Sequence, residues 1–553
     1  GLINVNFIES VDFYSGAFPA NRGNALSAII EFQQIQGNPE RLAGNLMLGS
    51  SDIGLTLDGP IGQNSNFLFS LRRSYLQLLF KALALPFLPT YNDAQARFEH
   101  RFNSKNKIVF VGLGAIDDFE LNQSVNDGVT DAQTLKRNEY ILGNLPVNTQ
   151  WNYAIGANYT HYADNSYQNV IFSRNHLNNA SVKYRNNVEL PENLLLDYQS
   201  QEIENKLRVE QTTRWKGVKI NAGGGIESAT YTVNSYQANP SDQGPEFFNV
   251  ESSLKLLKYS AFAQASQSFL NSRLRASIGL RTDFNNFSDS MNKPWKQLSP
   301  RASASYSLNE KWSLNANVGR YYQLPAYTVL GYRDSNGTLA NTDVKYIQVD
   351  HYIAGVEWLP SPFSSISVEG FYKDYANYPL SLRNGVSLAN LGGDFGVIGN
   401  EPVSSASEGQ SYGIEFLAQQ KLSNSIYGIL SYTFVRSFFD NGDGELKPSS
   451  WDNQHVLNIT AGKKFKNNWE LGLKFRFLGP GPYTPFDAQL TAQKEVWDNN
   501  QQGILDYSRV NSLRNPATHG LDIRLDKKWF FSKTALNAYI DIQNIYNFQA
   551  EAQ

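Results

Sequence analysis

The stretch that decides the fold lies near the start of the chain, at residues 7–32, and reads FIESVDFYSGAFPANRGNALSAIIEF. It predicts a short strand, a loop rich in glycine and proline, and a second short strand. No later stretch of the chain looks like it. Two short strands cannot bury a core of their own, so this stretch needs a larger structure that encloses it.

The composition narrows the function classes. The 553 residues include no cysteine, 48 basic and 51 acidic side chains, and carry a net charge of −3. The lack of cysteine excludes a disulfide framework, thiol catalysis and a cysteine-based zinc site. The balanced charge gives no reason to expect a nucleic acid as a partner. No run of 18 apolar residues exists, so no transmembrane helix is expected.

From Arg41 onward the sequence alternates between apolar and polar residues, the pattern of half-buried strands. Near the end, for example, Leu521 and Ile523 fall on one face, while Asp522 and Arg524 fall on the other. These patterns run for about 10–14 residues, whereas strands of soluble proteins average about 5–6. A tilted strand needs about 9–11 residues to cross a bilayer. The lengths therefore favour membrane-spanning strands over a soluble sandwich.

The connections between these strands are of two kinds. One set is very short, such as Lys216-Gly217 and Ser423-Asn424. Short turns at one rim and long loops at the other are typical of an outer-membrane barrel, with the turns in the periplasm. The long set is expected at residues 76–91, 162–199, 322–348, 378–408 and 480–518.

Six of the nine tryptophans are expected within a few residues of a short turn. Tryptophan rings suit the headgroup zone of a bilayer, where they form a girdle around outer-membrane barrels. The alternative is that they are core residues at the strand ends of a soluble sandwich. The predicted girdle comprises Trp151, Trp215, Trp312, Trp358, Trp469 and Trp529.

We expect about 21 strands, among them strands at 133–143, 149–161 and 200–213. A bacterial single-chain barrel closes with an even number of strands, so one returning strand is expected beyond Gln553. So wide a lumen is normally plugged.

The predicted fold class is therefore all-β: a large, about 22-stranded transmembrane antiparallel β-barrel with a partial plug domain inside its lumen. Residues 1–40 form the C-terminal part of the plug in this prediction, and residues 41–553 form the barrel.

The opening stretch resembles the C-terminal part of the plug of TonB-dependent outer-membrane receptors. The plug motif carried by this resemblance comprises Gly16, Arg22, Gly23 and Asn24. The resemblance covers nearly the whole chain, and the sequence is most similar in character to Bacteroidetes members of this family. Its remaining segments are Ile8–Phe13, Ile29–Glu31, Leu298–Ser303, Gly319–Pro325, Tyr412–Glu415 and Asp541–Asn547.

The chain also departs from the family pattern. Many members have arginine directly before the plug glycine, where this chain has Ser15. The front of the plug, the short box that contacts TonB and the final aromatic-ended strand are expected to lie outside this sequence. These departures leave the expected architecture unchanged, but they remove the segment through which energy would reach the receptor.

The resemblance implies plug-gated active uptake of a scarce nutrient across the outer membrane of a Gram-negative bacterium. The nutrient class stays open among siderophores, haem, cobalamin, oligosaccharides and peptides. The implied partners are a TonB–ExbB–ExbD complex, reached through an N-terminal box absent from this chain, and the surrounding outer-membrane lipid and lipopolysaccharide.

Arg22 is the plug charge that most needs a partner, because a charge in a confined lumen is costly when unpaired. Side chains alternate between the two faces of a strand, and this alternation places Glu369 and Glu415 on the inward faces of neighbouring strands. The resemblance implies a plug–barrel ion pair at Glu415, whereas Glu369 rests on parity alone. The alternative is that these are solvated lumen charges.

Ligand recognition is expected from the long loops and the outward side of the plug. Aromatic rings stack on sugars, porphyrins and catecholates alike, so they do not identify the ligand, and many pack within loops instead. The candidates are Tyr321, Tyr322, Tyr327, Trp451, Tyr483 and Trp497.

No sequence feature predicts covalent chemistry. The six histidines form no HxxxH or HxH pair, and no GxSxG or Walker sequence appears. We therefore expect no catalytic residue, no metal site and no cofactor. The alternatives to active uptake are a passive porin, which would lack a plug, and a surface receptor without transport. An outer-membrane enzyme is disfavoured because no nucleophile and base are paired.

Overall fold

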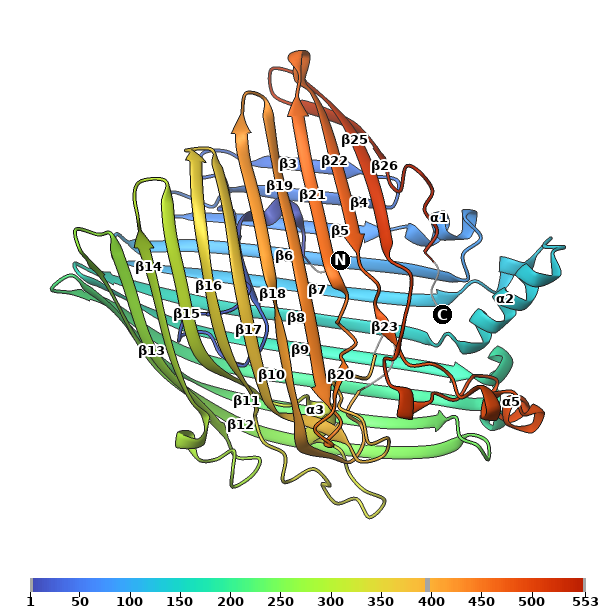
Figure 1. The fold of residues 1–553 in the computed structure, drawn as a ribbon. Helices are drawn as coiled ribbons and strands as arrows, with labels where there is room; N and C mark the ends of the chain where they lie inside the picture. Colours follow the sequence, from blue (N-terminus) through green and yellow to red (C-terminus); the bar gives the residue numbers. More distant parts are fainter. Residues whose placement is uncertain (1–2, 393–397, 551–553) are drawn as a thin grey trace.

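The computed structural model describes residues 3–392 and 398–550. Its main feature is one antiparallel sheet of 22 strands that curls into a barrel (Figure 1). Strands that follow one another in the sequence lie side by side in the sheet. Because β20 and β21 both pair with β19, the 22 strands occupy 21 positions. The predicted fold class is confirmed; a further strand beyond Gln553 stays a prediction.

The barrel strands are long, and several exceed twenty residues. Their bounds are β3 (Ala43–Leu48), β4 (Asp52–Pro60), β5 (Ser65–Ser74), β6 (Phe87–Asn103), β7 (Asn106–Leu121), β8 (Val147–Ala163), β9 (Ser166–Tyr184), β10 (Leu194–Trp215), β11 (Val218–Asn239), β12 (Glu246–Phe269), β13 (Leu274–Asn285), β14 (Leu298–Ser307), β15 (Trp312–Gln323), β16 (Ile347–Ser361), β17 (Ser364–Ser381), β18 (Val403–Ser423), β19 (Ile426–Asp440), β20 (Leu446–Pro448), β21 (Gln454–Lys464), β22 (Trp469–Leu478), β25 (Thr518–Phe530) and β26 (Ala535–Ile542).

The helices are short and lie in the long connections. They are α1 (Leu76–Ala82), α2 (Ala132–Asn144), α3 (Tyr327–Leu330), α4 (Ala488–Thr491) and α5 (Lys494–Asn500), and the last long loop also holds the paired short strands β23 (Pro482–Tyr483) and β24 (Leu513–Arg514). No helix of the described residues has the length and apolar character needed to cross a bilayer.

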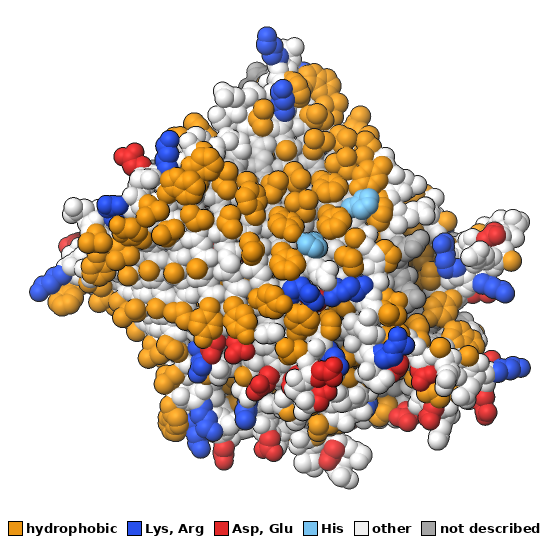
Figure 2. Space-filling view, in the orientation of Figure 1, with side chains coloured by type: hydrophobic (Ala, Val, Ile, Leu, Met, Phe, Trp, Pro, Cys, Tyr) orange, Lys and Arg blue, Asp and Glu red, His pale blue; other side chains and the backbone are white. Residues whose placement is uncertain are grey.

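The outer surface of the barrel is apolar. On β10, Leu207 and Val209 are exposed, while Glu210 and Thr212 are buried. Side chains alternate between the two faces of a strand, so the apolar residues of β10 face outward and its polar residues face the lumen. Figure 2 shows hydrophobic side chains over much of the strand surface, with charged side chains gathered mostly toward its margins. In a soluble protein, by contrast, apolar side chains are mostly buried and polar side chains are mostly exposed.

The short turns lie at one rim and the long loops at the other, as predicted. Two segments differ from the prediction. Residues 133–143 belong to helix α2, not to a strand, because Asp131 caps the helix by accepting a hydrogen bond from the Thr134 amide at 2.7 Å. Residues 162–199 are not one loop, because they contain β9. That strand is rich in asparagine, which is rare in strands and hides the pattern.

The tryptophan prediction holds in position for five of six residues. Trp151 is the exception: it pairs with Ile116 near the long-loop end of β8, far from the short turn that follows Ala163. The misplaced strand at 133–143 caused this error. The remaining five lie beside short turns, and their membership of a membrane girdle stays a prediction: Trp215, Trp312, Trp358, Trp469 and Trp529.

The opening stretch lies inside the barrel. Its strands β1 (Ile8–Tyr14) and β2 (Ile29–Gln34) form a two-stranded antiparallel sheet that is separate from the barrel sheet. The loop between them carries Phe18, which is only 1% exposed. Residues of β15, β16, β17 and β19 pack with Phe18 in one buried cluster, so the lumen is the enclosing structure that the sequence required.

We expect the outward face of β13 to be sensitive to charge according to depth. Ile278 lies within the strand and is 67% exposed, and Leu270 lies in the adjacent short turn and is 62% exposed. Ile278→Arg should lower the unfolding free energy in lipid vesicles by about 2–4 kcal/mol, and Leu270→Arg by about 0–1 kcal/mol. Urea titration of the folded barrel in vesicles measures both. Equal costs at the two positions would contradict a lipid-facing surface.

Candidate functional site

Side chains of the barrel wall hold the loop between β1 and β2, residues 15–28, by binding its backbone carbonyl oxygens. Arg301 of β14 makes the central contact: its Nη1 donates hydrogen bonds to the carbonyl oxygens of Phe18 at 2.9 Å, Pro19 at 2.5 Å and Arg22 at 2.7 Å. The Arg301 guanidinium also lies over the ring of Tyr321, 4.4 Å from its centroid. A buried guanidinium needs such partners, and the carbonyls of a loop need donors.

Two more inward side chains hold the same loop. Lys373 of β17 donates from Nζ to the carbonyl oxygens of Ser15 at 2.9 Å and Ser27 at 3.1 Å. His351 of β16 donates from Nε2 to the carbonyl oxygen of Leu26 at 2.9 Å. We call Arg301, His351 and Lys373 the backbone clamp. Because all three bind carbonyl oxygens, the clamp fixes the path of the loop independently of its side chains.

Phe18 is the apolar anchor of the loop. Its ring packs against Tyr321 of β15 with centroids 4.5 Å apart and meets the edge of His351 at 5.9 Å. Ala389, from the long connection between β17 and β18, belongs to the same buried cluster. The plug, the barrel wall and a long loop therefore share one small core.

The two plug glycines lie where the wall comes closest. A Cβ atom on Gly16 would come within 2.5 Å of Cδ1 of Ile353, and one on Gly23 would come within 2.1 Å of Nε of Arg281. A side chain at either position would have to displace Ile353 or Arg281. Arg281 in turn donates two hydrogen bonds to Asp283, at 2.5 and 2.7 Å, which fix the guanidinium beside the loop.

Asn24 links the plug to a long loop. Its backbone has φ of 55°, a conformation that asparagine tolerates better than most residues. Its Oδ1 accepts a hydrogen bond from the amide of Leu324 at 2.8 Å. Leu324 directly follows β15 and opens the connection that carries α3, so this connection is tied to the plug at its first residue.

The predicted partners of Arg22 are wrong. Arg22 forms an ion pair with Glu31 of β2, and its Nη1 lies 4.0 Å from Oε1 of Glu210 on β10. Glu369 and Glu415 do lie directly opposite each other on neighbouring strands. The parity argument found their shared face but not their position around the barrel, and the loop brings Arg22 to β10 instead of to β17 and β18.

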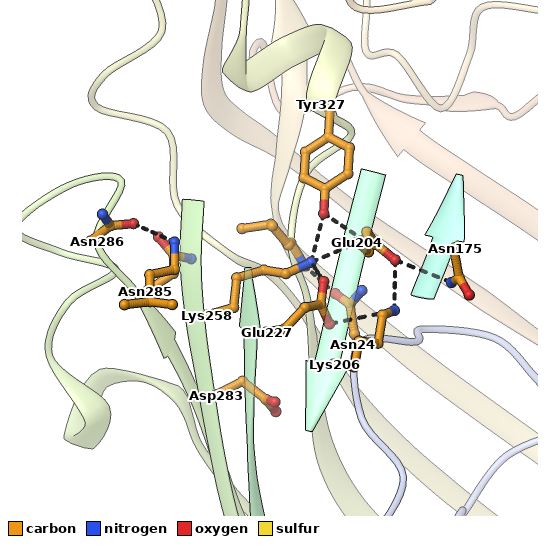
Figure 3. A network of polar contacts seen from close by, with 12 residues as sticks. Asn24, Asn175, Glu204, Lys206, Glu227, Lys258, Asp283, Asn285, Asn286 and Tyr327 are labelled. Carbon is orange, nitrogen blue, oxygen red and sulfur yellow. Dashed lines mark hydrogen bonds and ion pairs between the residues drawn. The ribbon is translucent and has the colours of Figure 1, made fainter. Parts of the chain in front are cut away.

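A charged network lies on the lumen wall beside the plug (Figure 3). Lys258 of β12 forms ion pairs with Glu227 of β11 and, at 3.1 Å, with Glu204 of β10. Lys206 adds ion pairs of 2.6 Å to Glu204 and 3.4 Å to Glu227. Opposite charges on three adjacent strands neutralise one another here, which makes them tolerable away from bulk water.

Tyr327 of α3 closes this network from above. Its hydroxyl donates to Oε1 of Glu204 at 2.6 Å and accepts from Nζ of Lys258 at 2.6 Å. Burial and the neighbouring Glu204 carboxylate raise the pKa of the Tyr327 phenol, so it stays protonated and remains the donor. The connection that begins at Leu324 is thus bonded to the plug at one point and to the wall at another.

The other predicted ligand residues separate into two groups. Tyr321 and Tyr322 are buried and pack among core residues, so the structure corrects their role from ligand contact to packing. Trp451 and Trp497 are exposed, and Tyr483 is half-buried in β23. These three lie in long loops and stay candidates for ligand contact.

The sequence arguments missed the clamp. Arg301 lies in the segment Leu298–Ser303, which carries part of the family resemblance, but the resemblance assigned it no role. Strand parity was the available signal: Arg301 is two residues from Ser299 on the buried face of β14, and both side chains face the lumen. For His351 and Lys373 the same parity gives an inward direction but not a partner. Among the described residues, no group of three or more acidic or histidine side chains is positioned to hold a metal ion.

The geometry defines a class: a large β-barrel whose lumen holds a separate plug segment. The model of the family described as "TonB dependent receptor-like, beta-barrel" matches residues 73–545. The chain therefore belongs to the TonB-dependent receptor family, as the opening stretch indicated. A comparison with curated protein sequences finds no match.

Solved structures of similar fold include receptors for iron carriers. The pyoverdine receptor FpvA of Pseudomonas aeruginosa has a TM-score of 0.69 and 14% identity, with 99% of this chain and 80% of that chain covered. The siderophore receptor PirA of Acinetobacter baumannii gives 0.69 and 11%, covering 99% and 82%. The ferric yersiniabactin uptake receptor FyuA of Yersinia pestis gives 0.65 and 13%, covering 98% and 80%. At these identities the likeness shows the fold.

Removing the central clamp residue should loosen the plug loop. Arg301→Ala removes the guanidinium that donates to the carbonyl oxygens of Phe18, Pro19 and Arg22, at a cost of about 1.5–3 kcal/mol. Amide protons of residues 15–24 should then exchange roughly 10- to 150-fold faster in hydrogen–deuterium exchange. The measurement uses the purified receptor in detergent.

Arg320→Ala is the matched control for this experiment. Arg320 lies on the neighbouring strand β15, where it pairs with Asp350 at 2.7 Å and makes no hydrogen bond to any described plug residue. Its substitution should leave exchange in the plug loop unchanged. Equal exchange in Arg301→Ala and wild type would show that the clamp does not hold the loop.

Proposed function

We propose that this chain is the plug and barrel of an active importer that takes up a scarce nutrient across the outer membrane. The observation that carries this proposal is the plug loop held inside the lumen by the backbone clamp. A passive pore has no use for a separate segment fixed across its lumen. A gate that opens on demand needs such a segment, together with contacts that can be broken and re-formed.

The contacts of the plug loop suit reversible release. Each hydrogen bond of the clamp contributes modestly, because water replaces it when the loop leaves the wall. The loop contributes two buried apolar side chains, Phe18 and Leu26, to the small core. We infer that a pull on the plug, delivered by a TonB–ExbB–ExbD complex, unfolds this weakly packed segment locally and opens the lumen.

The proposed cargo is a nutrient of the siderophore, haem, cobalamin or oligosaccharide class. Siderophore receptors stand among the structural neighbours, which supports iron uptake as one candidate, but similarity of fold does not choose the cargo. We propose that the barrel performs no covalent chemistry, and that it lies in the outer membrane of a Gram-negative bacterium among lipid and lipopolysaccharide. The proposed importer moves its cargo into the periplasm.

Nutrient-limited growth tests this proposal. A strain that lacks the gene should fail to grow on one nutrient of these classes, and the full-length receptor should restore growth only when TonB is intact. The reason is that the clamped plug closes the lumen until energy is supplied. Growth assays with each nutrient as the limiting source, in tonB-positive and tonB-negative strains, measure this.

Two outcomes would contradict the importer. Uptake that persists without TonB, together with a large constant conductance of the purified protein in planar bilayers, would identify a passive porin. Tight ligand binding at the cell surface with no uptake of any tested nutrient would identify a non-transporting surface receptor.

A further inference from the structure

A second site lies at the rim formed by the long loops. A cavity of about 850 Å³ opens between α2, the connection from β9 to β10, the end of β11 and the end of α5. Its volume falls in the range of about 300–1,000 Å³ typical of small-molecule sites. No described plug residue lines it. It is therefore separate from the backbone clamp and from the charged network of the lumen.

Amide side chains dominate this cavity. Nine of its 22 lining residues are asparagine or glutamine. Four of them build the walls through hydrogen bonds to the protein. Asn500 of α5, for example, donates to the carbonyl oxygen of Ser241 at 2.8 Å and accepts from the Ser241 amide at 3.2 Å. This pair joins α5 to the connection between β11 and β12.

The helix α2 is fixed in the same way. Lys183 of β9 is buried, and its Nζ donates to the carbonyl oxygens of Leu142 at 2.6 Å and Leu145 at 2.9 Å. It also donates to Oδ1 of Asn187 at 2.7 Å. One ammonium group thus joins the C-terminal end of α2 to the connection between β9 and β10. The two sides of the cavity are held in place before any ligand arrives.

The other five amides are free to bind. Their side chains hydrogen-bond to no residue of the described chain, and each offers two N–H donors and one carbonyl acceptor. A surface that offers both N–H donors and carbonyl acceptors suits a ligand with hydroxyl groups, because each hydroxyl group can donate and accept a hydrogen bond. The five line three sides of the cavity: Asn186, Gln237, Asn239, Asn499 and Gln502.

An aromatic surface borders these amides. Tyr140 of α2 lines the cavity and is 47% exposed, and Trp497 of α5 is 37% exposed. Their rings are nearly parallel, at 10°, with centroids 6.5 Å apart. Half-exposed rings beside free amides provide flat apolar faces against which the C–H faces of a sugar can pack.

The charges of the cavity do not favour an ionic ligand. Besides Lys183, whose ammonium is already bonded, its lining includes Lys136, Glu139 and Arg185. Two cations and one carboxylate give a mixed field, not the cluster of like charges that selects a phosphate or a polyanion.

We propose that this rim cavity binds an uncharged, polyhydroxylated ligand, namely a short oligosaccharide. Free amides would bind its hydroxyl groups, and Tyr140 would pack against a sugar ring. Two sources offer this chemistry: a soluble glycan from the surroundings and the sugar chain of lipopolysaccharide. The site binds its ligand whether or not the receptor transports it, so the proposal stands apart from the importer.

Titration of the purified full-length receptor tests the proposal. The probes are short α-glucan, β-glucan, mannan and galactan oligosaccharides, with purified lipopolysaccharide as a separate arm, and calorimetry gives the affinity. At least one probe should bind. Tyr140→Ala and the double variant Gln237→Ala/Asn239→Ala should each weaken that binding about tenfold, through loss of the ring face or of two hydrogen-bonding groups.

Two controls separate binding from folding. Tyr140→Phe keeps the ring and should bind like wild type, and Asn234→Ala removes an exposed amide of β11 that does not line this cavity. All variants should migrate as folded barrels in unheated electrophoresis. Binding of the lipopolysaccharide arm alone would support the site and assign its source. The proposal is overturned if no probe binds, or if binding survives both cavity variants unchanged.

Discussion

The barrel wall supplies hydrogen-bond donors to the backbone carbonyl oxygens of the plug loop. The guanidinium of Arg301 binds three of these carbonyls, and Lys373 and His351 bind three more. The dependence is mutual, because a buried cation without such acceptors would be strongly destabilising. The clamp binds the loop backbone, while the side chains of Phe18 and Asn24 add contacts that depend on the sequence of the loop.

This arrangement ties the plug to the long loops as well. Phe18 shares its core with Ala389, and Asn24 binds the amide of Leu324. A few residues further on, Tyr327 binds the charged network of the wall. A movement of the connection that carries α3 therefore disturbs a plug contact and a wall contact together. This shared set of contacts connects the loop rim physically to the plug and to the wall.

Strand alternation predicted the barrel well. The apolar faces of segments such as Leu521–Leu525 reflect an outer surface that must be apolar along its whole length, and this requirement leaves a strong period of two. The apolar–polar alternation gave wrong predictions for two segments, α2 and β9, whose structures depend on other interactions. Helix α2 begins at a side-chain cap on Asp131, and three of the four asparagines of β9 fall on its lumen face. Neither signal appears in a count of apolar residues.

The site was less predictable than the fold for a geometric reason. Parity states that Glu369, Glu415 and Arg301 face the lumen, but a lumen is enclosed by the whole ring of strands. Only the path of the plug loop decides which inward residue it meets. Arg22 therefore reached Glu210 instead of the predicted pair, and Arg301 became the main contact without any signal beyond its direction.

The central claim is that the plug loop must leave the wall for cargo to pass, and a reversible crosslink tests it directly. The chain has no cysteine, so Ala20→Cys/Gly279→Cys introduces a single pair. A Cβ on Gly279 would lie 2.9 Å from that of Ala20, and a small adjustment brings the two to the roughly 3.8 Å that a disulfide prefers. With the disulfide formed, receptor-dependent nutrient uptake should stop, and reduction should restore it, while each single-cysteine variant transports normally. Full uptake through a completely crosslinked receptor would contradict the account.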